Sequence, residues 1–151
     1  MVGVSALSPV SARFSPQELA VLAKLKATDR QVRAHEQAHL AVAGRYATSG
    51  ATYTFAAGPD GNLYAVGGEV KLDVAADPSD PEATIHKARV IEAAANAPAD
   101  PSGQDRRVAA AAVQMEIEAE QQLAAAQKRQ LDLAYGQPAG AGTGRLVLRL
   151  L

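Results

Sequence analysis

The sequence predicts a helix-rich α+β domain with a small antiparallel sheet. Apolar residues recur at helical spacing over residues 15–43 and again over residues 80–133. Between these stretches, residues 51–74 are rich in β-branched and aromatic residues and partly alternate between apolar and polar. A hydrophobic period that changes from 3.6 to 2 and back is typical of a sheet that packs beside helices.

Length and composition set the limits of this fold. The 151 residues suit one domain, which we place at residues 15–135 between a flexible arm (1–14) and a flexible tail (136–151). Hydrophobic residues make up 48% of the chain but aromatic residues only 4%, so the core should be thin and alanine-rich. Without cysteine, the chain has no disulfide and no thiolate metal ligand.

Charge and hydropathy limit the classes of partner that this protein can bind. The net charge of −1 gives no basic surplus for binding nucleic acid. No apolar run approaches the ~20 residues of a membrane-spanning helix. The N-terminal residues lack the basic and apolar regions of a signal peptide, so we expect a cytoplasmic protein.

The first helix should begin after Ser15. Pro16 suits the first helical position, and Glu18 completes a capping box with Ser15. The helical pattern then continues to about Ala43. A second capping signal at Thr28 leaves open whether this is one helix or two.

A β-hairpin should follow the first helix. Residues 51–55 and 62–66 have strand character and flank a Gly-Pro-Asp-Gly turn at 58–61. Residues 69–74 alternate strictly, as a half-buried third strand would. The sheet should therefore have two or three strands, and one this small must pack on helices.

Two more helices complete the predicted domain. Asp80 and Pro81 are typical of a helix start, and the helix should run to about Ala95. Ser102 and Asp105 resemble a second capping box, after which a long alanine-rich helix should run to about Leu133. Its narrow apolar stripe makes this helix a candidate surface for a homodimer.

The pattern His-Glu-x-x-His at residues 35–39 indicates a metal site. Two histidines four residues apart lie one turn apart on the same helix face, where both can bind one metal ion. Zinc metalloproteases combine such a pair, here His35 and His39, with a glutamate general base, here Glu36. The sequence therefore predicts a Zn²⁺ site with a peptide or protein substrate.

A catalytic zinc site also needs a third protein ligand. The third histidine of the extended metzincin motif is absent after His39. We favour Glu69, because two preceding glycines permit close approach to the motif helix, and we place His86 second. The remaining acidic candidates are Asp73, Asp77 and Glu82.

Four blocks of sequence resemble the SprA-related family of bacterial zinc metalloproteases. They read VRAHEQAHLAVAG (32–44), GPDGNLYAVGGEV (58–70), DPEATI (80–85) and APADPSGQDRRVA (97–109). The resemblance implies the same class of fold and a metalloprotease activity, which rests on the same His-Glu-x-x-His pattern.

These observations lead to the expectation of a zinc-dependent metallopeptidase in which Glu36 activates water. Tyr46, Tyr53 or Tyr64 could stabilise the oxyanion, and the hairpin over residues 53–66 could hold an extended peptide by edge pairing. The alternative is a non-catalytic interaction or structural domain, with or without zinc, that uses the long last helix.

Overall fold

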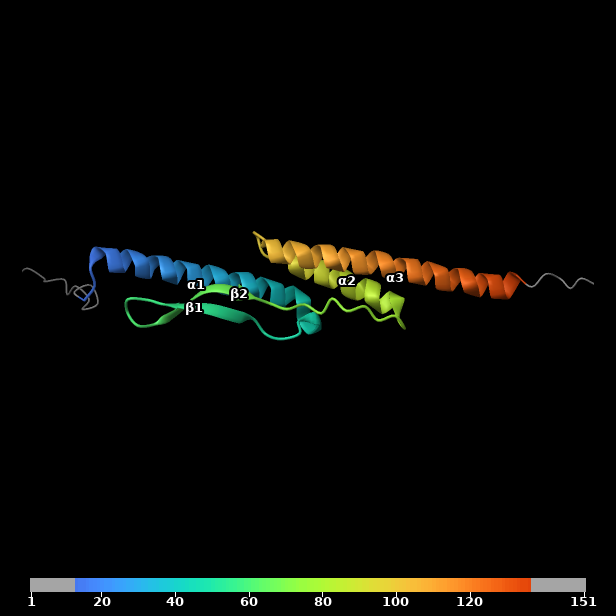
Figure 1. Ribbon diagram of the computed structural model, residues 1–151, viewed down its shortest axis with the longest axis horizontal. Coiled ribbons are helices and arrows are strands. Elements are labelled where there is room, and N and C mark those ends of the chain that lie inside the picture. The colour runs from blue at the N-terminus through green and yellow to red at the C-terminus, as the bar shows by residue number, and fades with distance from the viewer. Residues whose placement is uncertain (1–12, 137–151) are drawn as a thin grey trace, which may run out of the picture.

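The computed structural model describes residues 13–136, and its elements follow one another as three helices interrupted by a hairpin (Figure 1). They are α1 (Pro16–Ala43), a short 3₁₀ turn η1 (Gly44–Tyr46), β1 (Thr52–Ala57), β2 (Leu63–Glu69), α2 (Pro81–Ala95) and α3 (Gly103–Tyr135). The expected helix-rich α+β fold is confirmed. The arm and tail predicted at the chain ends lie almost wholly outside the described residues.

Local capping explains where the helices begin. The Ser15 hydroxyl accepts from the backbone N–H of Glu18, whose carboxylate accepts from the N–H of Ser15 at 2.7 Å. Asp80 caps α2, and Ser102 and Asp105 form a second capping box at the start of α3. Helix α1 is continuous, so the second capping signal inside it does not break it.

The hairpin lies along α1 (Figure 1). Strands β1 and β2 pair antiparallel from Thr52↔Glu69 to Ala57↔Leu63. A bulge inserts Val66, because Thr54 pairs with Gly67 whereas the next residue, Phe55, pairs with Ala65. The sheet has two strands in the described part of the chain.

The prediction that residues 69–74 form a third strand is wrong. Glu69 is the last residue of β2, and the segment after it makes only an isolated bridge between Leu72 and Ala47. The Leu72 side chain packs instead against the helical core. Alternation at residues 69–74 thus reflects an extended segment with one apolar side on the core.

Helix α2 packs against both α1 and α3 (Figure 1). The core cluster between α2 and α3 consists of Ala88, Ile91, Ala112 and Met115, with Tyr46, Leu72 and Val108 packed against it. Alanines let the two helix backbones approach closely, which gives the thin core that the composition predicts.

Helix α3 extends beyond α2, and its last turns are solvent-exposed (Figure 1). Leu131, Leu133 and Tyr135 are 58%, 80% and 84% exposed. Pairing of this helix with a second copy stays a prediction. Within residues 13–136, no helix is both long and apolar enough to span a membrane.

Candidate metal centre

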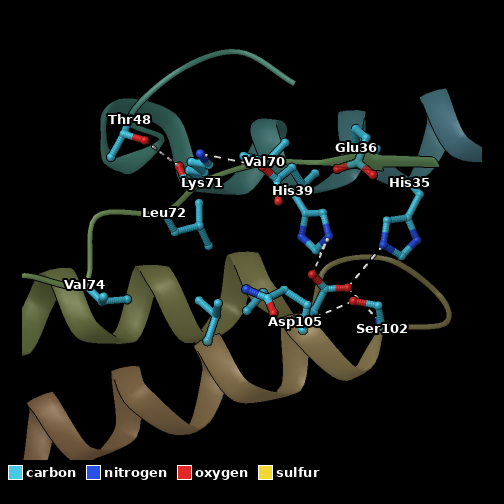
Figure 2. Close-up of a pocket in the computed structure, with 15 residues that line it drawn as sticks. His35, Glu36, His39, Thr48, Val70, Lys71, Leu72, Val74, Ser102 and Asp105 are labelled. Carbon is cyan, nitrogen blue, oxygen red and sulfur yellow. Dashed lines mark hydrogen bonds and ion pairs between the residues drawn. The ribbon is translucent and has the colours of Figure 1, made fainter. Parts of the chain in front are cut away.

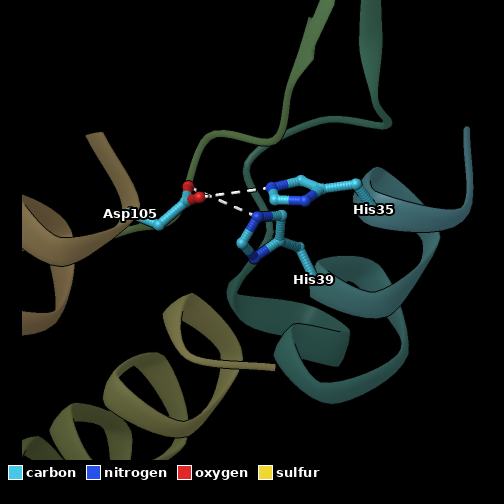
Figure 3. Close-up of side chains that lie close together, drawn as sticks. All are labelled: His35, His39 and Asp105. Atoms are coloured by element: carbon cyan, nitrogen blue, oxygen red, sulfur yellow. Dashed lines mark hydrogen bonds and ion pairs between the residues drawn. The ribbon is translucent and has the colours of Figure 1, made fainter. Parts of the chain in front are cut away.

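Three side chains from two helices, α1 and α3, converge on one another (Figure 3). His35 and His39 project from the same face of α1, and Asp105 reaches them from the first turn of α3. The Nε2 atom of His35 lies 3.2 Å from Oδ2 of Asp105, and Nε2 of His39 lies 3.3 Å from Oδ1. One ligand atom from each residue lies within 4.8 Å of the other two.

The tautomer of His39 is fixed by α2. Its Nδ1 lies 2.8 Å from the carbonyl oxygen of Ala94, which can only accept a hydrogen bond. The Nδ1 atom therefore carries the proton, and in the neutral ring Nε2 presents a lone pair towards the Asp105 carboxylate. Two acceptors that face each other at 3.3 Å need a cation between them, either a second proton on the ring or a metal ion.

The donor set fits zinc. Two imidazole nitrogens and a carboxylate oxygen are ordinary zinc ligands. Bonds of about 2.0–2.1 Å in a tetrahedral site place neighbouring ligand atoms about 3.3 Å apart. Each imidazole lies at about this spacing from one of the two Asp105 oxygens, His35 from Oδ2 and His39 from Oδ1, and a single ligand atom from each residue lies within 4.8 Å of the other two. Three protein ligands are typical of a catalytic site, in which a fourth position is open.

Asp105 has a second role as the capping residue of α3. The N–H of Ser102 donates to Oδ2 of Asp105 at 2.6 Å, and the N–H of Asp105 donates to the Ser102 hydroxyl at 3.1 Å. Burial raises the pKa of Asp105, but the interactions with Ser102 and the imidazoles of His39 and His35 outweigh burial and lower it overall. The carboxylate is thus held ionised and aimed at the two imidazoles.

Glu36 is buried beside this cluster (Figure 2). Glu36 is only 3% exposed, and its Oε2 atom has no hydrogen-bond partner among the described residues. Burial raises the pKa of Glu36, the two imidazoles lower it, and the charges of Asp105 and Glu69 raise it again; the net shift is upward. A carboxylate with a raised pKa and a free oxygen is suited to accept a proton.

The cluster borders a cavity of about 510 Å³ between α1, α3 and the extended segment after β2 (Figure 2). Apolar residues of its lining include Val70, Leu72 and Val74 from the extended segment and Val108 from α3. Glu36, both histidines and Asp105 also line it. A ligand with apolar side chains could therefore bind in the cavity next to the acidic and imidazole groups.

The structure does not bring the two favoured third ligands into the cluster. Glu69 lines the cavity, but its side chain is 54% exposed and its carboxylate lies 3.7 Å from Nζ of Lys71. His86 is exposed on α2. Among the other candidates, Asp73 pairs with Lys87 at 2.6 Å.

The remaining acidic candidates and the tyrosines lie elsewhere. Asp77 accepts from Ser79, and Glu82 is exposed at the start of α2. The hydroxyl of Tyr64 donates to Asp60 at 2.6 Å. None of the tyrosines predicted as oxyanion donors lines the cavity formed by the described residues.

Asp105 is the site residue that sequence reasoning missed. Its capping signal was visible, and it falls within the last family-like block, but a capping role alone does not indicate a metal ligand. Only the packing of α2 on both α1 and α3 brings the start of α3 to the histidines.

Fold and site together define a helix-rich α+β protein in which the two histidines of a His-Glu-x-x-His helix, α1, meet an aspartate from the start of α3. The model of the SprA-related family matches residues 11–137, and the chain belongs to that family. No curated protein and no solved structure shows significant similarity to it.

Proposed function

We propose that this protein is a zinc-dependent metallopeptidase, with His35, His39 and Asp105 as the metal ligands. The observation that supports this most directly is the convergence of these three donors beside a buried glutamate, one oxygen of which has no partner in the part of the chain that the structure describes. Asp105 replaces Glu69 in the proposal, because its carboxylate lies within 3.3 Å of both imidazoles. A bound zinc ion supplies Lewis acidity, which polarises a carbonyl and acidifies water.

Glu36 acts as the general base in this proposal. Its carboxylate accepts a proton from the attacking water and returns it to the leaving amine, so that each turnover restores the ionised form. Its upward-shifted pKa brings it closer to neutral pH, where proton transfer in both directions is most effective. Ala94 holds the His39 ring in its orientation through the hydrogen bond to Nδ1.

The substrate lies in the cavity beside these groups. The apolar lining residues Val70, Leu72, Val74 and Val108 suit an aliphatic side chain of a peptide. Two backbone hydrogen bonds fix the extended segment that contains Leu72 to η1 and the loop after it. The N–H of Asp73 donates to the carbonyl oxygen of Tyr46 at 2.8 Å, and the N–H of Thr48 donates to the carbonyl oxygen of Lys71 at 2.9 Å. The part of the cavity lining that this segment forms is therefore preorganised.

The proposal is tested by metal content and hydrolysis measured together. The purified protein should contain about one zinc ion per chain by elemental analysis, and it should cleave an unfolded protein such as casein until a chelator is added. His39→Ala should lose both properties. His86→Ala is the matched control, because this third histidine is exposed and away from the cluster, and it should keep both.

Either of two results would refute the proposal. Wild-type protein that neither contains zinc nor takes it up would remove the metal site. Zinc bound equally by wild type and His39→Ala would place the ion elsewhere.

A further inference from the structure

The backbone of β2 lies directly against the side chain of Glu36. A Cβ atom built on Gly68 would lie 2.7 Å from Oε1, 2.8 Å from Cγ and 3.0 Å from Cδ of Glu36. These separations are below van der Waals contact. A glycine at this position thus lets the strand touch the glutamate along much of its length, and Gly68 also lines the cavity.

The neighbouring glycine does not have this role. A Cβ atom on Gly67 would meet only Thr54, at 3.8 Å from its Cβ and 4.0 Å from its Oγ1, which is ordinary contact. Neither glycine has a positive φ, so alanine is compatible with the backbone at both positions. The two positions differ in what their Cβ atoms would meet.

Strand β2 is held in place next to α1 by a second contact. The N–H of Ala65 donates to Oδ1 of Asp29 at 2.8 Å, and Ala65 is fully buried. Asp29 lies two helical turns before Glu36, so both side chains are on the face of α1 that β2 covers. This hydrogen bond holds β2 against α1 three residues before Gly68.

We propose that Gly68 is a positioning residue for Glu36. By close contact its backbone restricts the orientation of the Glu36 carboxylate, whose Oε2 is buried and has no hydrogen-bond partner among the described residues. The inference rests on the proposed function for its catalytic meaning, but the contact itself can be tested without it.

Alanine at position 68 should displace the Glu36 carboxylate while leaving the metal ligands in place. The three nearest atoms that the added methyl group would meet all belong to Glu36. A displacement of about 1 Å of a catalytic group costs roughly 10²-fold in rate. We therefore expect Gly68→Ala to lower kcat by about 10²-fold with KM changed little, and Gly67→Ala to keep kcat within about threefold.

Zinc binding distinguishes a displaced Glu36 carboxylate from a general disruption of the site. Gly68→Ala and Gly67→Ala should both bind one zinc ion with wild-type affinity in competition with a chromophoric chelator. Loss of zinc from Gly68→Ala, or equal loss of kcat from both variants, would overturn the proposal.

A double-mutant cycle tests the contact in metal-free protein. The urea midpoint is measured for wild type, Gly68→Ala, Glu36→Ala and the double variant, all treated with chelator. Without steric conflict, Gly→Ala substitution raises stability by limiting the unfolded chain. Gly68→Ala should therefore lower the midpoint when Glu36 is present and raise it when Glu36 is replaced by alanine.

The same change of midpoint in both backgrounds would show that Gly68 does not hold Glu36 and would refute the inference. A wild type that binds no zinc and cleaves nothing would refute the proposed function instead, and the cycle would still report on the contact.

Discussion

Replacement of Asp105 by alanine should abolish tight zinc binding. In the proposed site this residue supplies one of three protein ligand atoms, and its side chain is only 16% exposed. Loss of a group that merely supports a ligand weakens metal binding 10–100-fold, at the order-of-magnitude level. Loss of the ligand itself should cost more than about 100-fold, or about 2.8 kcal/mol.

The assay is stabilisation of the folded protein by zinc. At a free zinc concentration of about 100 times the wild-type Kd, bound zinc stabilises the wild type by about 2.7 kcal/mol. With a Kd that is about 100-fold higher, the same zinc concentration stabilises Asp105→Ala by only about 0.4 kcal/mol. Urea unfolding with and without zinc measures both values.

Ser102→Ala is the control for the second role of Asp105. It removes the hydroxyl that accepts from the N–H of Asp105 but leaves the carboxylate in the cluster. It should cost about 1 kcal/mol with or without zinc and leave most of the response to zinc intact. A wild-type zinc response in Asp105→Ala would refute the ligand assignment. An equal loss in both variants would attribute the effect to the helix cap.

Four further predictions follow from the site and the fold. Glu36→Gln should bind zinc like wild type but lose about 10²–10⁴-fold in hydrolysis, because the amide cannot accept the proton. Glu69→Ala should retain zinc, since its carboxylate is outside the cluster. Ile91→Ala should lower the free energy of unfolding by about 2–5 kcal/mol, because this side chain is fully buried. The hydrogen bonds of Asp29 with Arg33 and with the N–H of Ala65 lower its pKa from 3.8. The stability this gives is present above pH 3.8 and lost as pH falls through the lower folded-state value, so Asp29→Asn should be less stable than wild type at pH 7 and approach it in acid.

Each of these four predictions would be contradicted by a specific result. Full hydrolysis by Glu36→Gln would exclude this residue as the base, and loss of zinc from Glu69→Ala would return it to the ligand set. An Ile91→Ala variant with wild-type urea midpoint would contradict the assigned core. A stability difference for Asp29→Asn that stays constant from pH 7 to below pH 3 would show that the carboxylate charge is not involved.

Elements with local signals could be predicted from the amino-acid sequence. The capping boxes that begin at Ser15 and Ser102 act over three residues, so they can be recognised without knowledge of the fold. The spacing of His35 and His39 places both on one face of any continuous helix, and the structure brings their Nε2 atoms to a common partner. The hairpin was likewise predictable from its strand residues and turn.

The third member of the cluster could not be predicted from local patterns, because its position depends on how the helices pack. Alternation at residues 69–74 predicted a strand, and the two glycines before Glu69 made it the favoured ligand, but neither pattern says which neighbour an extended segment meets. In the folded protein Glu69 pairs with Lys71 in solvent, and the backbone of Gly68 approaches Glu36 instead. Asp105, far along the chain, reaches the histidines because α2 packs on both α1 and α3. That juxtaposition depends on side-chain packing between helices, which no local pattern of residues specifies.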